Sequence, residues 1–155
     1  MVEFHKKAHY PVGRFPERNL KKNLFKRCSM TYCVGIRLKH GLVFCSDSRT
    51  TAGPDRVSTY SKLHRLSIPG DRQLMLMTAG NLATSQAVVA QIERDQREDA
   101  SFNVAKAQYV SDIDDYVGEL GVKEQQKFTG GGPGAGFNAE ATYILGGQIK
   151  GQPSE

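Results

Sequence analysis

Short runs of β-branched, aromatic and aliphatic residues dominate the first part of the patterned region, which begins after residue 30. Runs of this length, bounded by turn residues, are typical of β-strands. The predicted strands are residues 31–38, 42–45, 62–68, 72–79 and 141–145. The first two are joined by the turn-like Lys39-His40-Gly41, which predicts a β-hairpin. Residues 46–55 contain the breaker Gly53-Pro54 and predict a loop.

Two longer segments repeat their hydrophobic residues every three or four positions, which is the period of an amphipathic helix. The first begins after Asn81, a favourable N-cap residue, and is predicted to run to about Glu98. The second is predicted over residues 104–127. Its apolar face consists of Val110, Ile113, Val117 and Leu120. The glycine-rich residues 130–136 then predict a loop. Strands, two helices and a further strand are the order of an α+β protein with antiparallel sheets.

The excess of basic residues is confined to the start of the chain. The net charge is +5, but residues 1–30 hold eight Lys/Arg against two Asp/Glu, whereas the other 125 residues hold 13 against 14. A nucleic-acid-binding domain carries its positive charge on a folded face, so nucleic acid is not an expected partner of the body of the protein. Residues 1–29 have neither helical nor strand periodicity and predict a disordered basic arm. Salt-sensitive binding of nucleic acid or acidic lipid by this arm is left open.

Length and composition are typical of one soluble domain. A chain of 155 residues with 39% hydrophobic residues can form a single core. Its three cysteines make an odd set without a C-x-x-C pair, which argues against a disulfide framework and indicates the reducing cytoplasm. The sequence contains neither an apolar stretch of about 18 residues nor the apolar core of a secretory signal, so no membrane partner is expected.

Neither a metal nor another cofactor is expected. His5 and His9 have the spacing of a helical zinc motif but lack its glutamate, and they lie in the basic arm. Residues 130–136 are glycine-rich, but they follow a helix and no Lys-Ser/Thr follows to hold a phosphate.

The predicted hairpin brings one hydroxyl and one carboxylate together. A tight turn after residue 38 places Thr31 opposite residue 48 or 49, about 5 Å away across the ladder. Asp47 then becomes a neighbour of Thr31, although sixteen positions separate them. A threonine at the start of a buried strand with an acid beside it is a candidate catalytic site.

Several segments in fixed order resemble one family. They are Thr31-Tyr-Cys-Val-Gly-Ile-Arg-Leu38, Gly41-Leu-Val-Phe44, Ser46-Asp-Ser-Arg-Thr50, Ser58-Thr-Tyr-Ser-Lys62, Thr78-Ala-Gly80 and Leu145-Gly-Gly-Gln-Ile-Lys-Gly151. Together they resemble the Anbu (ancestral β-subunit) branch of the proteasome β-subunit superfamily over residues 30–153. The resemblance implies a four-layer αββα sandwich of antiparallel sheets, as in N-terminal-nucleophile hydrolases. It also implies a threonine-type peptidase that self-assembles into a ring or helix and acts on peptides or unfolded proteins.

The resemblance assigns a role to each matching position. It implies that Thr31 is the N-terminal nucleophile and that its α-amino group accepts the proton of the hydroxyl. Lys62 would stabilise the developing alkoxide, and Asp47 would hold Lys62 in place. The backbone N–H of Gly80 would donate to the oxyanion. The remaining implied roles are substrate clamping by the backbones of Thr51 and Gly80, and pocket formation by Thr78 and Leu82.

The chain departs from the family pattern in three respects. Thr31 is linked to Met30 by an amide bond, so we expect translation to start at Met30 or the Met30–Thr31 bond to be cut. Classical proteasome subunits commonly carry two adjacent lysines where this chain has only Lys62. Family members also continue past Glu155, so the β-subunit-like domain of residues 30–155 is expected to be incomplete, and poorly soluble or inactive alone. The alternative is an assembly protein without catalysis. No sequence feature identifies an ATPase partner.

Overall fold

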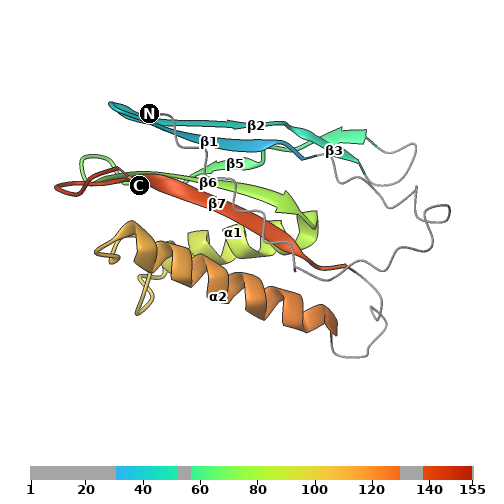
Figure 1. The fold of residues 1–155 in the computed structure, drawn as a ribbon. Helices are drawn as coiled ribbons and strands as arrows, with labels where there is room; N and C mark the ends of the chain where they lie inside the picture. The colour runs from blue at the N-terminus through green and yellow to red at the C-terminus, as the bar shows by residue number, and fades with distance from the viewer. Residues whose placement is uncertain (1–30, 52–56, 130–137, 155) are drawn as a thin grey trace, which may run out of the picture.

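A computed structural model describes residues 31–51, 57–129 and 138–154 of the chain (Figure 1). The predicted basic arm 1–29 and the loop 130–136 lie outside the described residues. The elements in chain order are β1 (Cys33–Leu38), β2 (Gly41–Ser46), β3 (Arg49–Thr51), β4 (Val57–Thr59), β5 (Leu63–Arg65), β6 (Arg72–Gly80), α1 (Leu82–Arg97), α2 (Val110–Thr129) and β7 (Ala141–Ile149). The predicted α+β class is confirmed.

The described elements stack in three layers. The strands form the antiparallel sheets β1-β2, β3-β4 and β5-β6-β7. The β1-β2 hairpin lies over one face of the β5-β6-β7 sheet, and α1 and α2 cover the other face (Figure 1). A second helical layer on the outside of the hairpin is not formed by the described residues. None of the described helices is long and apolar enough to cross a membrane.

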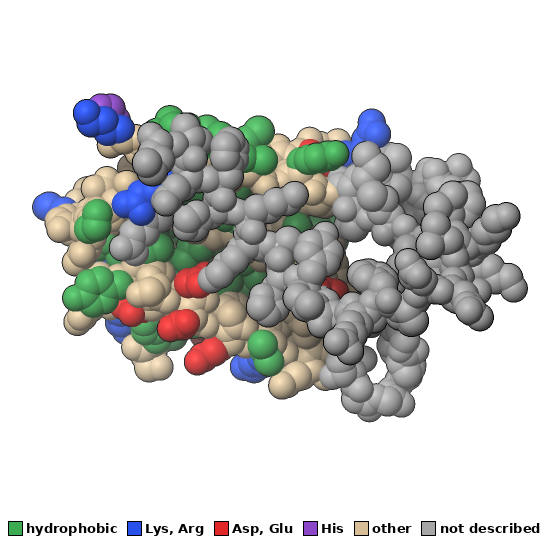
Figure 2. Space-filling model, in the orientation of Figure 1, with side chains coloured by type: hydrophobic (Ala, Val, Ile, Leu, Met, Phe, Trp, Pro, Cys, Tyr) green, Lys and Arg blue, Asp and Glu red, His purple; other side chains and the backbone are tan. Residues whose placement is uncertain are grey.

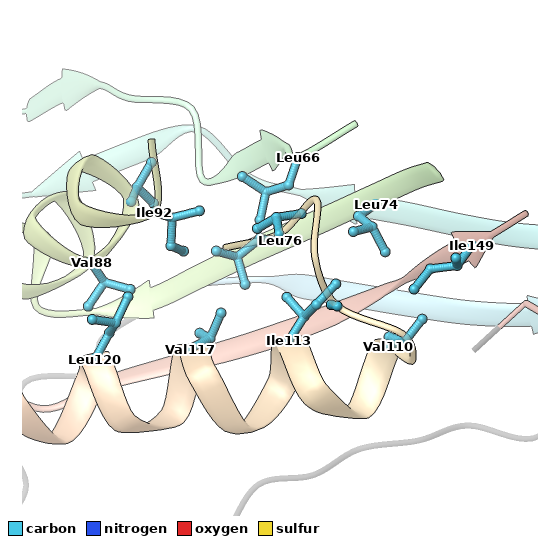
Figure 3. Packing of buried hydrophobic residues seen from close by; sticks show 13 residues of the cluster. Leu66, Leu74, Leu76, Val88, Ile92, Val110, Ile113, Val117, Leu120 and Ile149 are labelled. Atoms are coloured by element: carbon cyan, nitrogen blue, oxygen red, sulfur yellow. The ribbon is translucent and has the colours of Figure 1, made fainter. Parts of the chain in front are cut away.

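The hydrophobic core lies between the three-stranded sheet and the two helices (Figure 3). Its fully buried members are Leu74 and Leu76 of β6, Val88 and Ile92 of α1, and Ile113 of α2. Burial of each such side chain contributes about 1.5–3 kcal/mol to the stability of the fold. The core therefore holds β6 firmly, and β6 ends at Gly80 of the predicted site.

The outer face of the hairpin is apolar and exposed. Tyr32, Val34, Leu38 and Val43 have exposed fractions between 41% and 67%, and hydrophobic side chains gather along this side of the molecule (Figure 2). The inner face of the same hairpin contacts β6 and β7. The hairpin is therefore apolar on both faces, like a strand pair in the middle of a layered protein.

The predicted hairpin is confirmed, and three element boundaries are corrected. Leu38 pairs with Gly41, so the turn consists of two residues. The predicted loop 46–55 contains β3, which pairs with β4. The third predicted strand is shortened to β5, and the last is extended to Ile149, because β6 pairs along all nine residues of β7.

The second helix begins at Val110 and not at residue 104. The Asn103 side chain accepts hydrogen bonds from two backbone N–H groups that follow it, which favours a turn over a helix. Asp112 accepts bonds from the two N–H groups that precede the helix. The buried guanidinium of Arg72 donates to two backbone carbonyls of the turn, Val104 and Ala107.

Candidate active site

Three predicted site residues meet between the hairpin and the β5-β6-β7 sheet. Thr31 precedes β1, Asp47 follows β2, and Lys62 precedes β5. Lys62 Nζ donates to Thr31 Oγ1 at 3.1 Å and to the two carboxylate oxygens of Asp47 at 2.9 and 3.0 Å. One ammonium group therefore joins a hydroxyl and a carboxylate that lie 31 and 15 positions away in the chain.

The Lys62 ammonium is buried and fully hydrogen-bonded. Only 7% of the residue is exposed. Besides Thr31 and Asp47, the backbone carbonyl of Arg49 accepts a bond from Nζ at 2.7 Å. The three N–H groups of a lysine ammonium thus face three acceptor groups: a hydroxyl, a carboxylate and a carbonyl. Sequence reasoning missed Arg49, because a carbonyl is present in every residue and leaves no mark in the sequence.

Asp47 is tied to the strand opposite it. Its N–H donates to the carbonyl of Tyr32 at 3.0 Å, and the N–H of Tyr32 donates to Asp47 Oδ1 at 3.1 Å. Burial acts to raise the pKa of Asp47, but the hydrogen bonds from Lys62 and Tyr32 and the charge of Lys62 outweigh it and lower the pKa below its usual value. Asp47 is therefore a carboxylate at neutral pH and a suitable partner for a buried cation.

The register of β3 explains why the Arg49 carbonyl reaches Lys62. Tyr60 donates to the carbonyl of Ser48 at 2.8 Å, so these two residues form a hydrogen-bonded pair of the antiparallel ladder. Hydrogen-bonded and non-hydrogen-bonded pairs alternate. The backbone polar groups of Arg49 and Thr51 consequently face away from β4, toward the edge where Lys62 lies. The Thr51 side chain is outside the described part of the structure.

Gly80 ends β6 in a conformation that requires glycine. Its φ is +92°, and a Cβ would lie 2.5 Å from the carbonyl oxygen of Glu140. Thr78 donates to the Lys62 carbonyl at 2.9 Å, and Asn81 donates to Glu140 at 2.8 Å on the opposite edge. Because successive N–H groups of a strand alternate in direction, the N–H of Gly80 faces the Lys62 edge.

A thiol lies beside the predicted pocket residues. The Sγ of Cys33 donates to the Thr78 carbonyl at 3.7 Å and so links β1 to β6. Burial raises the pKa of Cys33, and the charge of Lys62 only partly offsets this. Thr78 is buried, and Leu82 is half-buried at the start of α1. Cys33 was not predicted as a site residue. Its position two residues after Thr31, on the same strand face, was the available signal.

The structure joins some predicted site residues and leaves others apart. Hydrogen bonds connect Thr31, Asp47 and Lys62, and a backbone bond connects Lys62 with Thr78. Gly80 and Leu82, whose backbone and side chains are described, have no hydrogen bond to this cluster.

Solved structures of other proteins share this arrangement of strands and helices. The Anbu complex from Pseudomonas aeruginosa, described as a helical assembly, is 37% identical with a TM-score of 0.73 over 79% of this chain and 50% of its own. Anbu from Yersinia bercovieri is 36% identical with a TM-score of 0.71, over 79% and 49%. A mutant of Anbu from Hyphomicrobium sp. strain MC1 is 36% identical with a TM-score of 0.69, over 80% and 49%. This chain is a relative of the Anbu proteins and has their proteasome-related fold.

The relationship to Anbu covers most of this chain but only part of the known proteins. The chain spans about half the length of the Anbu structures that it matches. No family model matches the sequence, and no curated protein sequence matches it. The resemblance found in the sequence motifs is thus confirmed by solved Anbu structures.

Proposed function

We propose that this chain carries the nucleophile of a proteasome-type threonine peptidase, and that Thr31 Oγ1 attacks the carbonyl carbon of a peptide bond. The observation that supports the proposal is the placement of Lys62 Nζ, 3.1 Å from the Thr31 hydroxyl and 2.9 Å from Asp47. A cation held at this distance favours the negative charge that develops on the hydroxyl oxygen during attack.

The remaining groups have the following proposed roles. Asp47 keeps the Lys62 ammonium in place, and its negative charge offsets the free-energy cost of burying that ammonium. The N–H of Gly80 donates to the oxyanion of the tetrahedral intermediate. Loss of one such donor typically removes about 2.7–4 kcal/mol of transition-state stabilisation. Collapse of the intermediate breaks the C–N bond, releases the amine product and leaves an ester on Thr31, which water then hydrolyses.

The proposed base is the α-amino group of Thr31 itself. An α-amine has an ordinary pKa of about 7.7–8.0, so a useful fraction is neutral at physiological pH. In the sequence this nitrogen is an amide, because Met30 precedes it. The proposal therefore requires removal of everything before Thr31, either by methionine removal after a start at Met30 or by cleavage of the Met30–Thr31 bond.

An extended peptide is the proposed substrate. The backbone groups of Thr51 face an edge of β3 with which no described strand pairs. A peptide strand could add to this edge and extend toward the N–H of Gly80. Thr78 and Leu82 would shape the pocket for the residue before the cleaved bond.

Completion of the fold and self-assembly are further parts of the proposal. We infer that a second helical layer covers the exposed apolar face of the hairpin, which would complete the four-layer αββα sandwich. A homo-oligomer in the cytoplasm is proposed, since one Anbu relative is described as a helical assembly and the described cysteines, Cys33 and Cys45, are free.

A covalent-labelling experiment tests the function. The complete gene product from Thr31 onward is treated with a peptide epoxyketone, and the modified residue is identified by mass spectrometry. Labelling of Thr31 and hydrolysis of a fluorogenic peptide are expected. Both should be abolished in Thr31→Ala and retained in Thr59→Ala, a control at an exposed threonine of β4. An assembled protein with a free, unlabelled Thr31 would instead indicate the non-catalytic assembly subunit.

A further inference from the structure

We propose that strand β3 couples the capture of a peptide to the placement of the Lys62 ammonium, with the Arg49 carbonyl as the positioning group. This inference rests on the proposed function and extends it. Its consequence is that pairing of a peptide with β3 raises the rate of the chemical step as well as the affinity.

The first support is the geometry around Lys62. Its three acceptors come from three segments: Thr31 before β1, Asp47 after β2, and Arg49 in β3. The bond to Arg49 is the shortest of the set at 2.7 Å. Because the ammonium is buried, a displaced Arg49 carbonyl could not be replaced freely by bulk water. A shift of β3 would therefore move Lys62 relative to the Thr31 hydroxyl.

The second support is that one strand edge carries both functions. Arg49 and Thr51 occupy alternate positions of β3, and both face away from β4. The Arg49 carbonyl on this edge binds Lys62, whereas the Thr51 backbone groups on the same edge have no described strand beside them. A peptide that pairs with Thr51 therefore binds two residues from the group that holds the ammonium.

The third support is the small size of the sheet that contains β3. The strand has only three residues, and its described sheet partner is the equally short β4. Isolated two-stranded pairs of this size are marginally stable. Addition of a third strand would restrict the motion of β3 and, through the Arg49 carbonyl, that of Lys62. Residues at such an edge are suited to convert binding free energy into correct positioning.

An N-methyl scan of a peptide substrate tests this coupling. The complete gene product with a free Thr31 is given a set of extended peptides, each methylated at one backbone nitrogen. N-methylation removes one donor, and only every second N–H of an added strand faces β3. Peptides methylated at facing positions should show kcat reduced about fivefold at saturation, the effect of one hydrogen bond. Those methylated at the alternate positions should keep kcat within about twofold.

A second readout reports Lys62 directly and does not depend on turnover. Reductive methylation of Lys62 is followed by mass spectrometry with saturating peptide. The parent peptide should slow labelling, and peptides methylated at facing positions should protect less than those methylated at alternate positions. Equal protection and equal kcat across the scan would overturn the coupling while leaving the peptidase proposal intact. Alternating protection without hydrolysis would keep the coupling and refute the peptidase.

A matched pair of protein variants perturbs β3 without touching the site. Ser58 lies in a hydrogen-bonded pair with Thr50, so Ser58→Pro removes an N–H that faces β3. In Thr59→Pro the lost N–H faces away from β3. Ser58→Pro should lower kcat at least fivefold with faster labelling of Lys62, and Thr59→Pro should stay within twofold of the wild type. Equal effects of the two variants on Lys62 labelling would contradict the coupling between β3 and Lys62.

Discussion

Replacement of Asp47 by Asn tests whether the carboxylate and the buried ammonium depend on each other. The change keeps the size of the side chain and an oxygen that can accept from the N–H of Tyr32, but it removes the negative charge. Lys62 would then hold a positive charge with only neutral acceptors, the Thr31 hydroxyl and the Arg49 carbonyl among them. The variant should fold with reduced stability and lose the proposed activity.

The size of the effect follows from burial. Side-chain exposure is 9% for Lys62 and 25% for Asp47. Removal of one partner from a buried pair typically destabilises a protein by about 3–5 kcal/mol. The quarter-exposed carboxylate is partly solvated, so we expect the lower limit, about 3 kcal/mol. For a chain of this length that corresponds to a fall in melting temperature of about 6–12 °C.

Unfolding in urea provides the assay, with Asp114→Asn on the exposed surface of α2 as the control. Asp47→Asn, Lys62→Met and the double variant complete a double-mutant cycle. The double variant should be more stable than the sum of the single losses predicts, because no uncompensated charge remains. If the single losses simply add within about 0.5 kcal/mol, the two side chains do not form a coupled pair and the reasoning is refuted.

The pH dependence of the same variant has a definite sign. The pKa of Asp47 is lowered in the folded state, so its contribution to stability is complete above the unfolded pKa of about 3.9 and is lost as pH falls through the folded value. The stability difference between wild type and Asp47→Asn should therefore persist from pH 7 to about pH 4 and shrink below it. A difference that changes between pH 7 and 5 would point to another group.

Three further predictions concern residues around the site and the core. Gly80→Ala should destabilise the protein by at least about 2 kcal/mol in urea unfolding, because residue 80 has a positive φ and a Cβ there would meet the Glu140 carbonyl. Gly118→Ala is the control: a Cβ there points into open space on the surface of α2, and the variant should be more stable by up to about 1 kcal/mol. Burial lowers the pKa of His64 in the folded state, so the stability of the wild type should fall as pH drops below about 6.5. Unfolding measured at several pH values should show that the stability of His64→Phe depends less on pH. Arg72→Met should leave the carbonyls of the turn before α2 without their donor, and hydrogen exchange in that turn should become faster.

The parts of the fold that could be predicted are those determined by local pattern. A two-residue turn leaves one register for the hairpin, and that register is sufficient to place Asp47 beside Tyr32 and near Thr31. Asn81 was predicted as the cap of the first helix because an asparagine side chain can accept a hydrogen bond from a backbone N–H in the first turn. In the structure Asn81 Oδ1 accepts from the backbone N–H of Thr84 at 3.1 Å.

The parts that could not be predicted depend on contacts between distant segments. Strand β3 has only three residues, which is too short to give residues 46–55 a strand pattern in the sequence. It is a strand because β4 pairs with it. The late start of α2 depends on Asn103 and on a guanidinium from β6, Arg72, that holds the preceding turn. Lys62 could be named from the resemblance alone, whereas its bond to Arg49 required the register of the β3-β4 pair.

The hydrogen bonds of Lys62 also narrow the choice of base for the Thr31 hydroxyl. In the proposed function Lys62 acts as a cation, because its Nζ is directed at three acceptor groups, the Thr31 hydroxyl, the Asp47 carboxylate and the Arg49 carbonyl. Asp47 is ionised, but its carboxylate oxygens are occupied by Lys62 and its lowered pKa makes it a weak base. The nitrogen of Thr31 is three bonds from its own hydroxyl oxygen, and it becomes basic only when the bond to Met30 is absent. A protein that retains Met30 should therefore bind an extended peptide but fail to react with an epoxyketone, and reaction of the uncut chain at Thr31 would show that some other group takes the proton.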